Sequence, residues 1–254
     1  MRTGCACKAS AAGDPVFQFA TRLVLSPLLI AQALGVRRIA QILPEATGPR
    51  DGVTGTGEAL RLRIIGDSSA AGVGASIQDE ALLGQLTSHL GKQFEVSWHL
   101  DAITGATTRS TLERLNSATP TRTDIIVLAL GVNDATRLIP PARWLKRHRA
   151  LLDRLRTLYQ PRHIYLSGMP PLGRFPLLPQ PLRWTLGQQA TAIDNVQIRH
   201  AARVDDLTHV PFDLDLDPDL MASDGFHPNP RLYAIWGEGL ANRIRSDWPG
   251  LNSQ

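Results

Sequence analysis

The sequence predicts an α/β fold with a doubly wound, mainly parallel five-stranded sheet, helices on both faces, and an additional N-terminal apolar helix. Strand-like and helix-like segments alternate about five times after residue 58, which is typical of this class. Residues 124–130 (DIIVLAL) form a nearly unbroken apolar run, as expected for a strand buried on both faces of a parallel sheet. The chain has 254 residues, 43% hydrophobic and 20% charged, so it can bury a large core and is neither disordered nor a polytopic membrane protein.

The individual elements follow from apolar periodicity. Helices are predicted where apolar residues recur every three or four positions, and strands where short apolar or alternating runs occur. The predicted strands cover residues 60–65, 94–100, 124–130, 163–167 and part of 204–212. The predicted helices cover residues 79–91, 107–115, 141–159, 181–203 and 231–245.

The N-terminal part, residues 1–57, is interpreted as a tail, an apolar helix and a linker. Residues 17–42 are apolar but interrupted, and the cleanest run is too short to cross a bilayer comfortably. We favour a helix that docks on a membrane or on the body of the main domain, and a signal anchor or a core helix are the alternatives. No convincing cleavable signal peptide is present, so location is open between cytoplasmic and membrane-associated. Residues 44–57 have the Pro, Gly and Thr content of a linker, which places the main domain at 58–250.

Charge gives little indication of a macromolecular partner. The formal net charge is only +4, and no run of five or more Lys or Arg occurs, so we expect no nucleic-acid partner. The basic residues within 141–159 are interpreted as a solvated helix face. The only cysteines, Cys5 and Cys7, lie in the tail and have no nearby histidines at metal-ligand spacing.

Polar residues that can perform acyl transfer follow the predicted strands. Ser68 comes directly after the first strand, and a serine becomes a nucleophile when a base and an orienting carboxylate are at hand. Asp224 and His227 offer both within four residues near the last strand. Gly105 can bring a backbone N–H close to a substrate, and Asn133 can add a side-chain amide, which are the donors that a developing oxyanion needs. Ligands of open α/β sheets bind at the carboxyl ends of the strands, so these residues are expected at one edge.

Four blocks of the sequence resemble those of the SGNH hydrolases, also called GDSL-type esterases and lipases. The blocks are Gly66-Asp67-Ser68-Ser69, Gly105, Gly131-Val132-Asn133-Asp134 and Asp224-Gly225-Phe226-His227-Pro228, and the resemblance spans residues 60–246. It implies a flavodoxin-like fold, with Ser68 as nucleophile, His227 as base and Asp224 as its partner. It also implies an oxyanion hole formed by the N–H groups of Ser68 and Gly105 and the amide of Asn133. Ser69 stands where the family name has leucine.

The expected function is a serine hydrolase that cleaves carboxylic esters or thioesters through an acyl-serine intermediate, with no metal or cofactor. Short-chain or lysophospholipid-type substrates fit this interpretation. The alternatives are an acyltransferase or O-deacetylase acting on carbohydrates, and a non-catalytic binding module on the same fold. Residues 169–181 (MPPLGRFPLLPQP) can line an acyl pocket or form an ordinary surface crossover, and Leu172 and Phe175 are its candidate lining residues. The oligomeric state is left open.

Overall fold

The computed structural model describes residues 24–212 and 217–252. Two compact units, Met1–Ile39 and Ala40–Gln254, make up the chain. Cys5, Cys7 and the first part of the predicted apolar segment lie outside the described residues.

The first unit contains helix α2 (Ser26–Ile39), which ends with Arg37 and Arg38 in its last turn. It lies within the segment expected to be an apolar helix. Among the described residues, no helix is both long and apolar enough to span a bilayer. Docking of this helix on a membrane stays a prediction.

The second unit is built on a sheet that has six strands within the described residues, in the order β1-β3-β2-β4-β5-β6. Their bounds are Asp51–Thr54 for β1, Glu58–Gly66 for β2, Phe94–Ala102 for β3, Ile125–Ala129 for β4, His163–Ser167 for β5 and Leu207–Val210 for β6. Strands β2 to β6 are parallel to their neighbours, and β1 pairs antiparallel with β3. The parallel strands β3-β2-β4-β5-β6 have the flavodoxin-like order.

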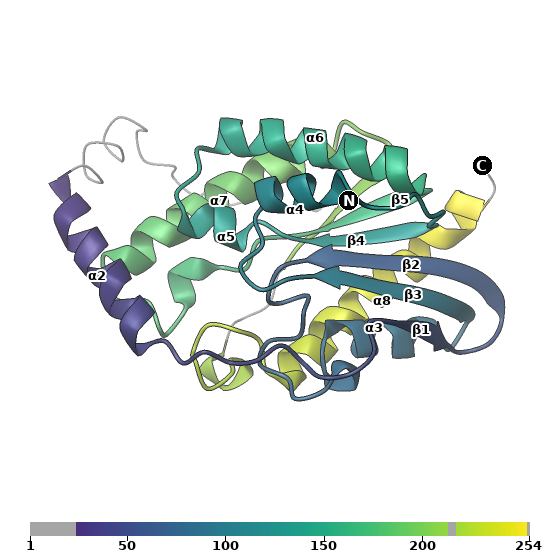
Figure 1. The fold of residues 1–254 in the computed structure, drawn as a ribbon, viewed down its shortest axis with the longest axis horizontal. Coiled ribbons are helices and arrows are strands. Elements are labelled where there is room, and N and C mark those ends of the chain that lie inside the picture. The colour runs from purple at the N-terminus through teal and green to yellow at the C-terminus, as the bar shows by residue number, and fades with distance from the viewer. Residues whose placement is uncertain (1–23, 213–216, 253–254) are drawn as a thin grey trace, which may run out of the picture. The chain divides into compact units, whose positions relative to one another are not determined.

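Helices cover both faces of this sheet (Figure 1). On one face lie α4 (Thr108–Leu115), α6 (Pro141–Tyr159) and α7 (Leu182–Ala201), and on the other lie α3 (Leu82–Leu90) and α8 (Pro230–Asn252). A short helix, α5 (Val132–Thr136), follows β4, and single 3₁₀ turns occupy Gln78–Glu80, Leu172–Arg174 and Pro218–Leu220. The core accordingly forms two hydrophobic clusters of buried residues. The prediction of a doubly wound α/β fold is confirmed.

The structure adds one strand to the predicted five. Residues 44–57, expected to be a linker, contain β1, whose residues alternate between exposed and half-buried at the edge of the sheet. Its sequence, DGVT, carries one apolar residue and one glycine, so no periodic pattern marks it as a strand. The domain boundary near residue 58 remains a prediction, but the segment before it is ordered against β3.

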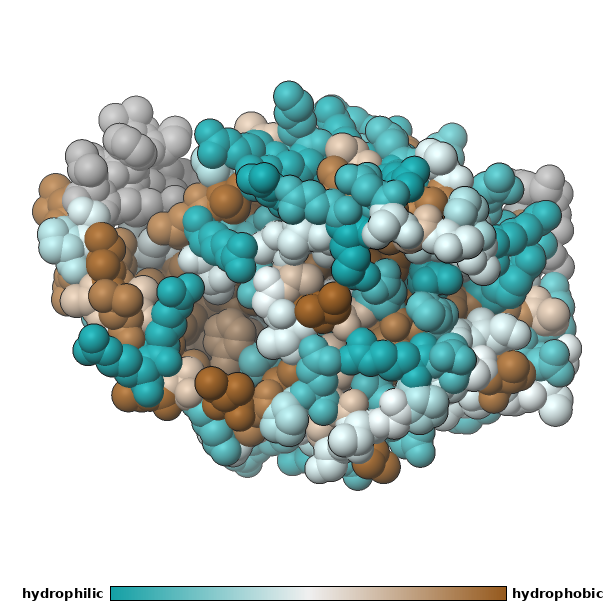
Figure 2. Space-filling view, in the orientation of Figure 1, coloured by the Kyte–Doolittle hydropathy of each residue, from teal (hydrophilic) through white to brown (hydrophobic). Residues whose placement is uncertain are grey.

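Helix α6 carries the basic run noted in the sequence. Trp144, Leu151 and Leu155 face the core, whereas Arg143 and Lys146 are exposed. Figure 2 shows mainly hydrophilic side chains over this helix. This arrangement is that of an amphipathic helix with a solvated outer face.

Candidate active site

The candidate site lies where the strand order of the parallel sheet reverses. The chain leaves β2 toward β3 on one side, and later returns to β4 on the other side of β2. In open α/β sheets, the crevice at this reversal, beyond the carboxyl ends of the strands, is where ligands bind. Ser68 follows the end of β2, and Asn133 follows the end of β4. The fold therefore places Ser68 and Asn133 at the ends of two neighbouring strands.

Ser68 sits in a tight loop between β2 and the first turns before α3. Its carbonyl accepts a hydrogen bond from the N–H of Val73 at 3.0 Å, and its residue is 8% exposed. Gly74 lets this loop approach the C-terminal segment closely, because a Cβ on Gly74 would lie 2.1 Å from the Pro228 carbonyl oxygen. Its φ of +100° also disfavours any residue with a side chain. The loop that carries Ser68 therefore packs directly against the segment that carries His227.

Asp224 and His227 lie in a short hairpin between Met221 and Pro228, which we call the catalytic hairpin because it carries these two candidate residues. These two end residues form an antiparallel bridge, and the N–H of Ala222 donates to the His227 carbonyl at 2.8 Å. Asp224 Oδ1 accepts hydrogen bonds from the N–H groups of Phe226 and His227, at 2.9 and 3.0 Å. The hairpin therefore fixes the carboxylate and the imidazole relative to each other.

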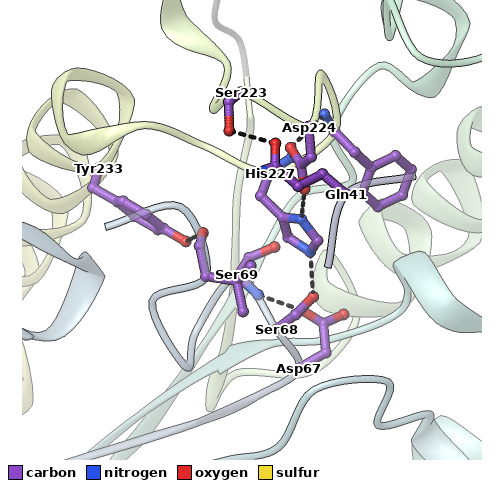
Figure 3. A network of polar contacts seen from close by, with 10 residues as sticks. Gln41, Asp67, Ser68, Ser69, Ser223, Asp224, His227 and Tyr233 are labelled. Carbon is purple, nitrogen blue, oxygen red and sulfur yellow. Dashed lines mark hydrogen bonds and ion pairs between the residues drawn. The ribbon is translucent and has the colours of Figure 1, made fainter. Parts of the chain in front are cut away.

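The three side chains are joined in sequence by hydrogen bonds (Figure 3). His227 Nδ1 lies 2.5 Å from Asp224 Oδ2, and His227 Nε2 lies 2.9 Å from Ser68 Oγ. A proton on Nδ1 satisfies the carboxylate and leaves Nε2 free to accept from the serine hydroxyl. Burial raises the pKa of Asp224, but the hydrogen bonds from His227 and Phe226 outweigh it, so the pKa lies below its ordinary value. Asp224 is then ionised at neutral pH and keeps the imidazole in this tautomer.

Two of the three expected oxyanion donors are backbone N–H groups. Within the described residues, the N–H groups of Ser68 and Gly105 donate to no protein acceptor. Gly105 lies in the loop after β3 with a φ of +79°, a conformation that favours glycine. A buried backbone N–H without an acceptor is uncommon, and at Ser68 it is suited to receive an oxyanion.

Asn133 is held by Asp67, a contact that the sequence analysis did not anticipate. Asn133 Nδ2 donates to Asp67 Oδ2 at 3.3 Å, while Asp67 Oδ1 accepts from the Ser69 N–H at 3.1 Å. Asp67 is 2% exposed, and burial raises its pKa to about 6 in spite of these hydrogen bonds. The buried carboxyl therefore orients the amide proposed as an oxyanion donor. In the sequence, only the position of Asp67 directly before Ser68 pointed to a role for Asp67 in the site.

A second buried carboxyl, that of Asp134, links the loop that carries Gly105 to the helix that carries Asn133. Asp134 Oδ2 accepts from the N–H of Thr108 at 2.8 Å and from its hydroxyl at 2.9 Å. Thr108 begins α4, just after the loop with Gly105, whereas Asp134 follows Asn133 in α5. Burial raises the pKa of Asp134, which is fully buried. This contact ties the Gly105 loop to α5 across the sheet edge.

A hollow with mainly apolar walls lies beside the nucleophile, with an empty volume of about 560 Å³ including its open mouth. We call it the apolar hollow. Its walls come from the ends of β4 and β5, the loop after β5, the catalytic hairpin and α8. The lining residues are Asp67, Ser69, Ala129, Leu130, Val132, Ser167, Gly168, Met169, Pro170, Phe175, Phe212, Met221, Phe226, Pro228, Leu232 and Trp236. Of the two residues singled out in 169–181, Phe175 lines the hollow, and Leu172 is buried without lining it.

Two other features complete the surroundings. Gln41 reaches the catalytic hairpin, where its Oε1 accepts from the Ser223 hydroxyl at 2.9 Å (Figure 3). In the part of the chain that the structure describes, no three or more His, Cys, Asp or Glu side chains gather in a way that could hold a metal ion.

The family follows from comparison with known proteins. The model of the GDSL-like lipase/acylhydrolase family matches residues 64–235. The chain belongs to this family. The resemblance inferred from the four sequence blocks is confirmed, and with it a hydrolase of the esterase and lipase type.

Solved structures with the same fold are distant in sequence. One is TesA, at 20% identity with a TM-score of 0.58, covering 73% of this chain and 98% of the other. Another is the psychrotrophic esterase EstA from Pseudoalteromonas sp., at 20% identity and a TM-score of 0.54, covering 75% and 98%. A third is a carbohydrate esterase from Corynascus thermopiles with its carbohydrate-binding domain, at 18% identity and a TM-score of 0.59, covering 82% and 69%. No curated protein matched the chain.

Proposed function

We propose that this protein hydrolyses carboxylic esters through an acyl-serine intermediate formed on Ser68. The hydrogen-bonded chain from Ser68 Oγ to His227 to Asp224, at 2.9 and 2.5 Å, is the observation that carries the proposal. Membership of the GDSL-like family supports it, since esterases and lipases belong to that family.

In the proposed reaction, Ser68 Oγ attacks the ester carbonyl carbon while His227 Nε2 takes the hydroxyl proton. The C=O electron pair moves to the oxygen, which accepts hydrogen bonds from the N–H groups of Ser68 and Gly105 and the amide of Asn133. His227 then gives its proton to the leaving alcohol as the C–O bond breaks. Water, activated by the same histidine, attacks the acyl-serine and releases the carboxylic acid.

A fluorophosphonate probe tests the nucleophile, because it modifies only an activated serine. We expect stoichiometric labelling of the native protein at Ser68, and no labelling of Ser68→Ala. The exposed serine on α3 provides a matched control, so Ser88→Ala should label like the native protein. Labelling that persists in Ser68→Ala, or that never occurs, would contradict the proposal and favour a non-catalytic module.

Hydrolysis of p-nitrophenyl acetate gives the corresponding kinetic test. Ser68→Ala should lose nearly all turnover, because the acyl-serine cannot form. Addition of a sugar or a simple alcohol then separates hydrolysis from transfer. A hydrolase should release mainly the free acid, whereas an acyl ester of the added alcohol as the main product would identify an acyltransferase.

A further inference from the structure

Residues 41–50, which precede β1, contact three segments of the candidate active site, and we call them the strap. At its start, Gln41 accepts the hydrogen bond from Ser223 of the catalytic hairpin (Figure 3). Residues 44–50 were expected to be part of a linker. The strap lies before residues 64–235, which match the family model, so it is outside the region that this chain shares with that model.

The middle of the strap is joined to the loop that carries Ser68. The Ala46 N–H donates to the Ala71 carbonyl at 3.3 Å. The buried side chain of Gln78 donates through Nε2 to the carbonyls of both Ala46 and Ala71, each at 3.1 Å. The N–H of Gln78 also donates to the Thr47 carbonyl at 2.8 Å. The strap is therefore anchored on the side of the nucleophile.

The end of the strap is joined to β3, just before the loop that carries Gly105. The Leu100 N–H donates to the Arg50 carbonyl at 2.7 Å, and Arg50 Nη1 donates to the Ala102 carbonyl at 2.6 Å. Arg50 Nη2 donates to Glu45 Oε2 at 2.5 Å. The carboxylate of Glu45 is thus held within a segment that is anchored on both sides.

Gly105 lies in a tight turn that is exposed to solvent. The Ala106 N–H donates to the Ile103 carbonyl at 3.1 Å, which closes a four-residue turn with Thr104 and Gly105 at its centre. The Ile103 N–H donates to the Gly66 carbonyl at 3.3 Å and so joins the start of the turn to β2. A Cβ on Gly105 would meet nothing within 4 Å. Packing around Gly105 therefore contributes little to holding its N–H in place.

Glu45 supplies hydrogen bonds to the centre of this turn. Its Oε1 accepts from the N–H of Thr104 at 2.8 Å and from the Thr104 hydroxyl at 2.7 Å. Burial raises the pKa of Glu45, but the hydrogen bonds from Thr104 and the charge of Arg50 outweigh it, so this pKa lies below its ordinary value. The carboxylate is then ionised at neutral pH, and hydrogen bonds to an ionised acceptor are stronger than neutral ones. The residue directly before Gly105 is therefore restrained twice.

We propose that Glu45 is a positioning residue for the oxyanion hole, which holds the turn at Thr104 so that the Gly105 N–H points to the oxygen of the tetrahedral intermediate. This inference rests on the proposed esterase function. It adds to the site a residue outside the four sequence blocks. Glu45 acts through Thr104 and not on the substrate itself.

The reaction is sensitive to the position of such a donor. A donor stabilises the oxyanion when it lies about 2.7–3.1 Å from the oxygen, and a displacement of about 1 Å can cost about 10²-fold in rate. An exposed turn can shift by such a distance when its centre is not tethered. Glu45 opposes this shift because Arg50 and the anchored strap fix its own position.

Two variants of Glu45 test the inference with p-nitrophenyl acetate. Glu45→Ala removes the acceptor of both bonds from Thr104, so kcat/KM should fall by about tenfold. Glu45→Gln loses the ion pair with Arg50 but keeps an oxygen that can accept from Thr104, so kcat/KM should stay within about threefold of the native value. The matched control is Glu113→Ala, which also removes a Glu–Arg ion pair, with Arg109, but on the exposed surface of α4. Its kcat/KM should equal that of the native protein.

Inhibition by trifluoroacetone separates positioning from a loss of folded protein. Ser68 Oγ adds to the carbonyl carbon of this ketone, the hydroxyl proton passes to His227 Nε2, and the C=O electron pair becomes an alkoxide in the oxyanion hole. The inhibition constant does not depend on the fraction of folded enzyme. It should rise by about tenfold in Glu45→Ala, by the same factor as kcat/KM falls, because the inhibitor resembles the transition state. It should stay near the native value in Glu45→Gln and in Glu113→Ala.

The outcomes also separate the two proposals. An unchanged inhibition constant in Glu45→Ala, or an equal increase in Glu45→Ala and Glu45→Gln, would overturn the positioning inference. If Ser68 is labelled and esters are hydrolysed in that case, the esterase proposal stands. If no ester is hydrolysed and Ser68 is not labelled, both proposals fail.

Discussion

Replacement of Asp67 by asparagine should change the pH dependence of stability in a defined way. The Asp67 carboxyl is 2% exposed, and its pKa rises from an ordinary 3.8 to about 6. Burial disfavours the charged form, and the hydrogen bonds from Ser69 and Asn133 offset this only in part. The difference of about 2 in pKa corresponds to about 3 kcal/mol of folding free energy.

The sign follows from proton binding. Because the folded-state pKa is the higher one, the folded protein holds this proton between about pH 4 and pH 6, where the unfolded chain has lost it. The native protein therefore loses stability relative to Asp67→Asn as the pH rises through this window. Between pH 4 and pH 7 the relative loss should amount to about 2 kcal/mol, since part of the titration lies below pH 4.

Urea unfolding of both proteins at several values between pH 4 and pH 8 measures this difference. Asparagine also loses a hydrogen bond, because its amide nitrogen cannot accept from the Ser69 N–H or from the Asn133 amide. That loss is the same at every pH and only shifts the curve. Other carboxylates are shared by both proteins and cancel. A native-minus-variant difference that stays flat from pH 4 to pH 7 would refute the assignment of a buried, proton-holding carboxyl at Asp67.

Three further substitutions test the construction of the site. Asp224→Asn should reduce kcat by about 10³- to 10⁴-fold without unfolding the protein, because the amide no longer holds the imidazole in the productive tautomer; an unchanged kcat would contradict the assigned pairing. Gly74→Ala should destabilise the fold by about 1–3 kcal/mol or more, measured by thermal or urea unfolding. The new Cβ would clash with the Pro228 carbonyl oxygen, and the positive φ of Gly74 disfavours a side chain. An unchanged stability would disprove the close approach of the two segments. Asp134→Ala should lower kcat more than it raises KM, because the contact between Asp134 and Thr108 is lost. Asp134→Asn should keep much of the activity, because its amide oxygen can still accept from Thr108. Equal loss of activity in both variants would contradict a role of Asp134 in positioning the site.

The long elements could be predicted because burial leaves a periodic trace in the sequence. Helix α6 has the predicted bounds of residues 141–159, with Trp144 and Leu151 among its buried residues. Strand β4 was evident from its apolar run, because both of its faces are covered by helices. Strand β1 and the five-residue α5 were not predicted, since neither has enough residues to establish a period.

The candidate site, like the fold, has a part that the sequence predicts and a part that it does not. Its chemical groups occur in short blocks, so residue type and order pointed to Ser68, Asp224 and His227, whose roles remain a proposal. The supporting contacts depend on distances between elements, and no local pattern encodes them. Asp67 meets Asn133 only because β2 and β4 are neighbours in the sheet, and their registers place Gly66 beside Ala129.

The same reasoning explains why substrate preference was the least predictable property. The apolar hollow takes walls from two strand ends, one loop, the catalytic hairpin and α8, so its size depends on how these elements pack. Residues 169–181 suggested a pocket wall, but only the structure distinguishes Phe175, which lines the hollow, from Leu172, which does not. In this fold the candidate reactive groups follow from short sequence blocks, whereas the shape of the apolar hollow follows from tertiary packing. Variation at Met169 or Phe175 can therefore alter the shape of the hollow and leave the four blocks intact.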